Sequence, residues 1–149
     1  MKLAEKWIDY GVIGILVLMS IVTLWLFIER MMFYSSVKIE KFDHRDTLDA
    51  VLTENLTTIS TIGSNAPYVG LLGTVLGIMI TFYSMGNVEQ IDPKAIMSGL
   101  ALALKATAMG LVVAIPATIV YNALMRKVDI IITRYDRYVE VIEKREVDA

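Results

Sequence analysis

The sequence has no cysteine and a single histidine, and these two shortages exclude several classes of chemistry. Without cysteine the chain can form no disulfide, thiolate metal site or thiol nucleophile. His44 stands between charged residues and has no spaced partner for a metal cluster or for nucleophilic catalysis. We interpret His44 as a solvated residue of a loop or helix start, and we expect no metal and no cofactor.

An excess of either charge is also lacking, because 14 basic and 16 acidic residues leave a formal net charge of −2. The sequence therefore offers no basic surface for a nucleic acid. Hydrophobic residues make up 56% of the 149 positions, and the mean hydropathy is +0.59. One soluble core of this length would not bury so much apolar material, so the composition predicts a membrane protein in contact with lipid.

Three apolar runs are long enough, at about 1.5 Å per residue, to cross roughly 30 Å of hydrocarbon. They cover about residues 10–28, 67–85 and 95–124. Two lysines precede the first run, as in a signal peptide, but two acidic residues share that segment and no small-residue cleavage site follows it. We therefore expect the first span to be retained. The sequence predicts an all-α integral membrane protein with a single membrane domain over residues 1–149.

Turn and cap residues delimit the second and third spans. Ser64 or Asn65 can cap the second span, with Pro67 in its first turn, where a missing N–H costs nothing. Gly86-Asn87 and Asp92-Pro93 bracket a very short polar connection. The second and third spans are therefore predicted to form a tight helical hairpin.

Two polar segments adjoin the spans, a connector over about residues 30–64 and a tail over about 125–149. Apolar residues of the connector recur at three- and four-residue steps after Asp46, which predicts one amphipathic helix. These residues are Leu48, Val51, Leu52, Leu56 and Ile59. The third span contains Pro116, which is expected to kink it, and continues past Arg126 as an amphipathic helix. Neither segment is large enough for an enzyme domain.

Basic residues predict the orientation of the spans, because they gather on the cytoplasmic side of a membrane protein. The connector and the tail carry most of them, so the amino terminus is predicted outside and the carboxyl terminus inside. The connector contributes Arg30, Lys38, Lys41 and Arg45, the tail contributes Arg126, Lys127, Arg134, Arg137, Lys144 and Arg145, and the other side has Lys2, Lys6 and Lys94.

Small residues recur at three- and four-residue steps along the second and third spans, so each span has one small, weakly polar face. The faces consist of Gly70, Thr74, Gly77, Thr81 and Ser84, and of Gly99, Ala103, Thr107, Gly110, Ala114 and Ala117.

Two interpretations of these faces remain open. The first is ordinary close helix packing, with Thr74 and Thr107 bonding their own preceding turns. The second is that both faces line a space holding a helix from another chain, with the two hydroxyls near an ion path. Gly70, Gly77, Thr81, Ala103, Gly110 and Ala114 would then pack against that partner helix. Neither span contains Asp or Glu, so a titrating carboxylate would have to come from the partner.

Two stretches of these spans resemble the ExbB/TolQ family, which is related more distantly to the flagellar stator protein MotA. The first is APYVGLLGTVLGIM at 66–79, and the second is ATAMGLVVAIP at 106–116, followed by Tyr121-Asn122. Within that family the chain is most similar to ExbB. The resemblance implies a bacterial inner-membrane ring of five such chains around two ExbD-like helices. Such a ring uses the proton-motive force to do work on a TonB-like protein for outer-membrane nutrient import.

The resemblance also implies roles for individual residues. Thr74 and Thr107 match the pore-facing threonines of the family, and the proton carrier is an aspartate on the single-span ExbD-like partner. The chain departs from the family at Leu102, where ExbB proteins commonly carry a glutamate, so any role of that glutamate does not transfer. Lys105 is a second departure, because most members are apolar there.

Lys105 is predicted to lie about 16 Å along the third span, where an unpaired charge costs several kcal/mol. Its helical position points it away from Thr107, toward lipid or a neighbouring subunit. Two interpretations stay open: the ammonium reaches toward the lipid headgroups, or it pairs with a carboxylate of the partner or of an adjacent subunit.

The sequence thus predicts a non-enzymatic proton-channel and stator subunit that is active only with its partner. The alternatives are a TolQ-type subunit for envelope maintenance and a non-conducting oligomeric membrane scaffold. An enzyme is disfavoured because the chain has no catalytic constellation.

Overall fold

The computed structural model describes residues 2–86 and 93–148, and within these ranges the chain is helical, with no strand. The elements are α1 (Lys2–Ser36), a short 3-10 helix η1 (Ile39–Lys41), α2 (Arg45–Thr53), α3 (Leu56–Met85) and α4 (Pro93–Val147). The predicted all-α fold is confirmed.

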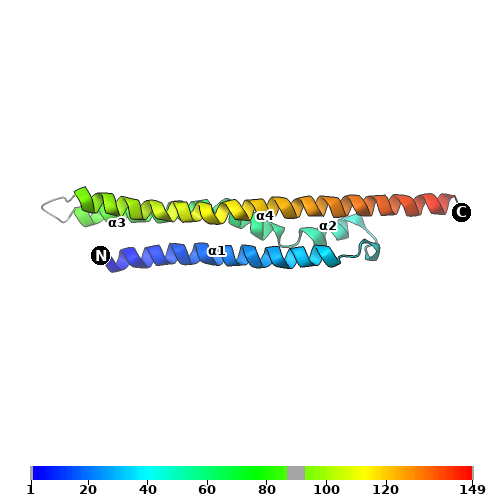
Figure 1. The fold of residues 1–149 in the computed structure, drawn as a ribbon, viewed down its shortest axis with the longest axis horizontal. Helices are drawn as coiled ribbons and strands as arrows, with labels where there is room; N and C mark the ends of the chain where they lie inside the picture. Colours follow the sequence, from blue (N-terminus) through cyan, green and yellow to red (C-terminus); the bar gives the residue numbers. More distant parts are fainter. Residues whose placement is uncertain (1, 87–92, 149) are drawn as a thin grey trace.

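The three long helices lie side by side along the long axis of the molecule (Figure 1). α3 and α4 pack along each other, and α1 packs on both. α2 is short and packs on α4, whose carboxyl-terminal end extends beyond the other helices (Figure 1). At about 1.5 Å per residue, the 55 residues of α4 are far longer than one membrane crossing requires.

Three helical segments are long and apolar enough to cross a membrane, as predicted. They are Tyr10–Ser36, Leu56–Met85 and Ile96–Val147, with mean hydropathies of 2.6, 1.6 and 1.9 over their most apolar stretches. Their orientation in the membrane stays a prediction.

The expectation of one connector helix across residues 46–59 is wrong. α2 ends at Thr53 and α3 begins at Leu56, and between them Asn55 adopts a left-handed backbone with a φ of 64°. Asparagine tolerates this conformation better than most residues, so it can break the helix here. The apolar periodicity hides the break because Leu52 and Leu56, on either side of it, pack into the same cluster.

The expected helix cap at Ser64 or Asn65 is also wrong. Ser64 and Asn65 lie inside α3, where their side chains donate to the carbonyls of Ser60 (2.9 Å) and Thr61 (2.8 Å) instead of capping a helix. Pro67 is therefore an interior residue of α3. The helix begins earlier because Leu56 and the turns after it pack against α4. At the other end, α4 starts at Pro93, and the predicted cap Asp92 and the turn residue Asn87 lie outside the described residues.

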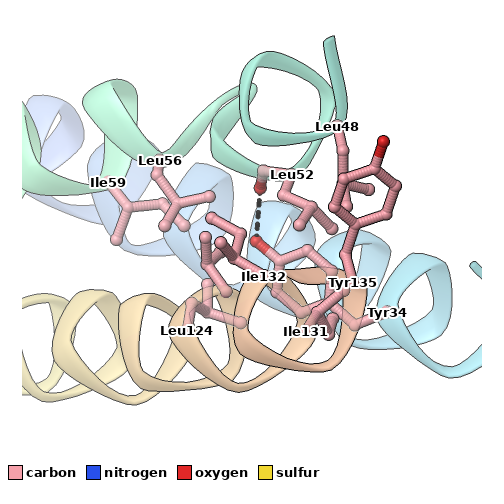
Figure 2. Packing of buried hydrophobic residues seen from close by; sticks show 10 residues of the cluster. Tyr34, Leu48, Leu52, Leu56, Ile59, Leu124, Ile131, Ile132 and Tyr135 are labelled. Carbon is pink, nitrogen blue, oxygen red and sulfur yellow. Dashed lines mark hydrogen bonds between the residues drawn. The ribbon is translucent and has the colours of Figure 1, made fainter. Parts of the chain in front are cut away.

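Two buried clusters hold the helices together. The span cluster joins α1, α3 and α4 through Val12, Leu16, Ile62, Ala66, Val113, Ala114 and Ala117. The connector cluster consists of Tyr34, Leu48, Leu52, Leu56, Ile59, Leu124, Val128, Ile131, Ile132 and Tyr135. Figure 2 shows the leucines of α2 facing the isoleucines and tyrosine of α4 within it. The connector cluster therefore fixes α2 against the part of α4 that follows the membrane-spanning stretch.

The end of α1 holds the carboxyl end of α2, whose last carbonyls have no partner within the helix. The Tyr34 hydroxyl donates to the Leu52 carbonyl at 2.6 Å, drawn as the dashed line in Figure 2. The guanidinium of Arg30, only 5% exposed, donates to the Val51 carbonyl at 3.1 Å and pairs with Glu29. Arg30 also lies over the Phe33 ring at 4.9 Å. These contacts fix the α2–α3 break against α1.

Candidate functional site

The small faces of α3 and α4 pack against each other within the chain. A Cβ added at Gly70 would lie 2.7 Å from the Ala106 carbonyl oxygen, and one at Gly110 would lie 2.7 Å from the Ala66 carbonyl oxygen. The two glycines approach each other as well, because the Gly70 Cα is 3.1 Å from the Cβ position of Gly110. Backbone meets backbone here, so only glycine fits at these two crossing points.

Other small residues continue this close approach along the same pair of helices. A Cβ at Gly77 would lie 2.9 Å from the Ala103 Cβ, and one at Gly99 would lie 2.7 Å from the Thr81 hydroxyl. A Cβ at Gly73 would lie 2.8 Å from the Ala106 Cβ of α4 and 2.9 Å from a Val12 methyl carbon of α1. The interface is therefore tight from one end of the crossing to the other.

Thr74 and Thr107 meet inside this interface, with their hydroxyl oxygens 2.5 Å apart. Thr74 is 7% exposed, and its hydroxyl also contacts the carbonyls of Ala103 (3.1 Å) and Gly70 (3.3 Å). Each hydroxyl has one proton and two lone pairs, so either threonine can donate in the shared bond, whereas the carbonyls only accept. In the arrangement in which Thr74 donates to a carbonyl, Thr107 donates to Thr74 and keeps lone pairs free to accept another hydrogen bond.

This geometry combines features of both interpretations of the small faces. Thr74 does bond its own preceding turn at Gly70, as ordinary packing requires, but it also bonds α4 at two points. Thr107 is half-buried and lies closer to the edge of the interface. A buried hydroxyl pair with one accessible member is what a polar site for an outside group needs.

The residues predicted to pack against a partner helix occupy different environments. Gly70, Ala103 and Gly110 are buried between α3 and α4, whereas Ala114 belongs to the span cluster beside α1. Gly77 and Thr81 are half-buried, and the Thr81 hydroxyl donates to the Gly77 carbonyl at 2.8 Å. Packing of a partner helix against these residues stays a prediction.

Lys105 and Pro116 both lie on the exposed side of α4. Within residues 2–86 and 93–148, Lys105 makes no hydrogen bond or ion pair. Leu102 and Leu104 beside it are 44% and 61% exposed, so this stretch faces outward from the single chain. α4 continues through Pro116 to Val147. The charge pairing of Lys105 and a kink at Pro116 stay predictions.

The membrane-spanning stretches around the hydroxyl pair carry no carboxylate of their own, as the sequence of 66–85 and 95–124 requires. In the part of the chain that the structure describes, no group of three or more His, Asp and Glu side chains could hold a metal ion. The site therefore consists of hydroxyls and backbone carbonyls in apolar surroundings.

The contacts of Arg30 and Tyr34 with α2 were not predicted from the sequence. The charged residues there indicated only the polar end of the first span. Close packing of the small faces was one of the two interpretations, but the spacing of Gly70 and Gly110 did not show which face each would meet.

Three helices able to cross a membrane and a buried hydroxyl pair between two of them define a multi-pass membrane protein with a polar site inside its apolar region. Residues 28–137 match the model of the MotA/TolQ/ExbB proton channel family. The chain belongs to this family.

Curated relatives share most of the chain. The biopolymer transport protein ExbB of Aquifex aeolicus is 55% identical over 128 residues, which cover 86% of each chain. ExbB of Helicobacter pylori strain J99 is 51% identical over 135 residues, covering 91% of this chain and 93% of the relative. The Tol-Pal system protein TolQ of Pseudomonas aeruginosa is 45% identical over 84 residues, covering 56% of this chain and 36% of the relative.

Proposed function

We propose that this chain is the proton-channel and stator subunit of an ExbB-type motor in a bacterial inner membrane. It assembles with copies of itself around an ExbD-like single-span partner that carries an intramembrane aspartate. Together they convert the proton-motive force into work on a TonB-like protein for outer-membrane nutrient import. The amino terminus lies in the periplasm, and the connector and tail lie in the cytoplasm.

The observation that carries this proposal is the Thr74–Thr107 hydroxyl pair. When Thr107 donates to Thr74, the free lone pairs of Thr107 can accept a hydrogen bond from an O–H group outside the chain. A protonated carboxyl group of the partner is such a donor, and apolar surroundings favour its neutral form. When the aspartate ionises, the Thr107 hydroxyl must turn to donate to it. The pair can thus hold the carboxyl group in either protonation state.

The proton itself would travel on the partner aspartate, not through the threonines. Besides Thr107, the Thr74 hydroxyl contacts only the Gly70 and Ala103 carbonyls, which are not protonated at physiological pH. The hydroxyl pair is therefore a docking point for the carboxyl group. This division of labour agrees with the lack of Asp and Glu in 66–85 and 95–124.

Lys105 contributes to the same assembly by pairing with a carboxylate of the partner or of an adjacent subunit. Its exposed position on the outward face of α4 and its lack of a partner within the described residues support this role. Desolvated ammonium groups at membrane depth are costly unless they are paired.

A TolQ-type role in envelope maintenance is the second candidate, because TolQ of Pseudomonas aeruginosa is also similar to this chain. The ExbB role is preferred, since the ExbB proteins of Aquifex aeolicus and Helicobacter pylori match along most of their own length, whereas that TolQ is matched over 36%.

The test is to purify the chain with an ExbD-like protein from the same genome, determine the native mass, and measure proton flux in liposomes. The chain alone, the partner alone and the pair are compared. We expect a stable complex of several copies and flux only from the pair. A complex that assembles but conducts no protons would support a structural scaffold and contradict the proposal.

A further inference from the structure

The helices α2 and α4 carry opposite charges on their outward faces. Helical positions turn by about 100° per residue, so Arg137 lies opposite the α4 side chains that enter the connector cluster and Arg134 lies on the flank of the helix beside Ile131. Asp46 and Asp49 lie on the exposed side of α2, away from the buried Leu48. Since the buried faces of α2 and α4 meet in the connector cluster, the acidic and the basic face both point away from this contact.

A shallow groove of about 360 Å³ lies between side chains of α4 alone on the basic face. It is lined by Arg126, Asp129, Ile130, Thr133, Arg134 and Arg137. Its three arginines and single aspartate give it a net positive charge. Ile130, half exposed, adds an apolar contact in the middle of the groove.

The charged side chains on both faces are free to form ion pairs with another molecule. Within residues 2–86 and 93–148, ion pairs link Arg30 to Glu29 and Glu54, Arg45 to Asp136, and Lys144 to Glu140. Neither the groove arginines nor Asp46 and Asp49 take part in any of them. All of these side chains are exposed.

The two faces also lie at the same level along the helix axes. The Arg45 Nε is 3.1 Å from the Asp136 carboxylate, and the Tyr135 hydroxyl donates to the Phe42 carbonyl at 3.1 Å. The start of α2 is thus beside residues 135–136 of α4, within one turn of Arg134 and Arg137. A second copy related by rotation about an axis parallel to the helices would bring its acidic face level with this groove.

The spacing of the charges matches as well. Asp46 and Asp49 are three residues apart, and so are Arg134 and Arg137. Residues three apart lie about 5–6 Å from each other on one helix face. Two such pairs on adjacent helices can form two ion pairs at once, and Ala50 next to Asp49 leaves room for Ile130.

We propose that α2 of one copy docks into the α4 groove of the next copy, with Asp46 and Asp49 facing Arg134 and Arg137. The proposal rests on the self-assembly in the proposed function and names the surface that performs it. Each copy offers one face and receives the other, so the contact is head-to-tail and closes into a ring when the rotation divides a full turn.

The absence of cysteine makes a crosslinking test direct. The full chain carrying both Asp49→Cys and Arg134→Cys is produced in membranes with its ExbD-like partner and oxidised. We expect a ladder of covalent multimers. The single variants should stay monomeric, because in a head-to-tail contact residue 49 meets residue 134 and not another residue 49. Asp49→Cys combined with Glu143→Cys, on the exposed tail, is the matched control and should give no ladder.

Charge reversal gives a second readout that does not depend on disulfide geometry. Asp46→Lys with Asp49→Lys, and Arg134→Glu with Arg137→Glu, should each lower the assembled fraction in native mass measurements severalfold. The four substitutions together should restore it. An assembled wild-type ring with no ladder and no rescue would overturn the proposed surface and leave the proposed function standing. Crosslinked dimers from a single variant would overturn the head-to-tail arrangement, and a monomeric wild-type chain would overturn the self-assembly itself.

Discussion

Thr74 and Thr107 join α3 and α4 through a hydrogen bond between their hydroxyls, and the Thr74 hydroxyl also contacts one carbonyl of each helix. Thr107 lies at the edge of this tight apolar interface, where its hydroxyl can accept or donate a further hydrogen bond. The proposed role of the site follows from this position.

Gly70→Ala and Gly110→Ala should each destabilise the chain by about 1–3 kcal/mol, because the added methyl group meets backbone at 2.7 Å and forces the helices apart. Thermal unfolding in detergent measures the loss. Gly14→Ala is the matched control, since nothing lies within 4 Å of a Cβ there. Equal melting temperatures for the Gly70 and Gly14 variants would contradict the observed approach of α3 and α4.

Tyr34→Phe should leave the Leu52 carbonyl without its partner and cost about 1–3 kcal/mol. The loss should speed hydrogen exchange of the backbone amides around the α2–α3 break, which mass spectrometry can follow. Tyr138→Phe, at an exposed position of the tail, should change nothing. Unchanged exchange at the break in the Tyr34 variant would show that the Tyr34 hydroxyl does not hold α2.

Asn55 provides a test of the break itself. Asn55→Gly should be neutral or slightly stabilising, because glycine adopts a φ of 64° without a steric penalty. Asn55→Ala should destabilise the chain by about 1 kcal/mol or more, because the Cβ of alanine makes the left-handed conformation unfavourable. The measurement is the free energy of unfolding of the glycine and alanine variants, each compared with the wild type. An alanine variant as stable as the glycine variant would mean that the chain here is a continuous helix.

Lys105→Met should weaken co-purification of the ExbD-like partner severalfold if the ammonium pairs with a carboxylate, whereas Lys105→Arg keeps the charge and should retain the complex. Quantitative pull-down from detergent extracts measures the difference. Full retention of partner and proton flux in the methionine variant would assign Lys105 to contact with lipid headgroups.

The apolar runs predicted the three helices because a long stretch without charge has few alternatives to a membrane helix. The break at Asn55 could not be predicted in this way, since Leu52 and Leu56 keep the same periodicity across it and enter one cluster. Ser64 and Asn65 misled the prediction for a related reason. Polar side chains that cap a helix start can equally bond the preceding turn inside a helix, and only the packing of the flanking residues decides between the two.

The candidate site, too, could be predicted only in part from the sequence. Thr74 and Thr107 were identified by their spacing and by the family resemblance, but their contact with each other depends on the crossing of α3 and α4 at Gly70 and Gly110. A one-dimensional pattern does not contain that crossing. The acidic and basic faces at Asp49 and Arg134 became evident only when the structure placed α2 beside the tail.

The most direct measurement is proton flux through the purified complex with its partner when Thr107 is changed. Thr107→Val removes the acceptor at nearly constant volume and should reduce flux at least tenfold, whereas Thr107→Ser keeps the hydroxyl and should conserve most of it. Thr61→Val, at an exposed position of α3, controls for the loss of a hydroxyl as such. Full flux in an intact complex of the valine variant, and equally in the Thr74→Val and Thr107→Val double variant, would contradict the account.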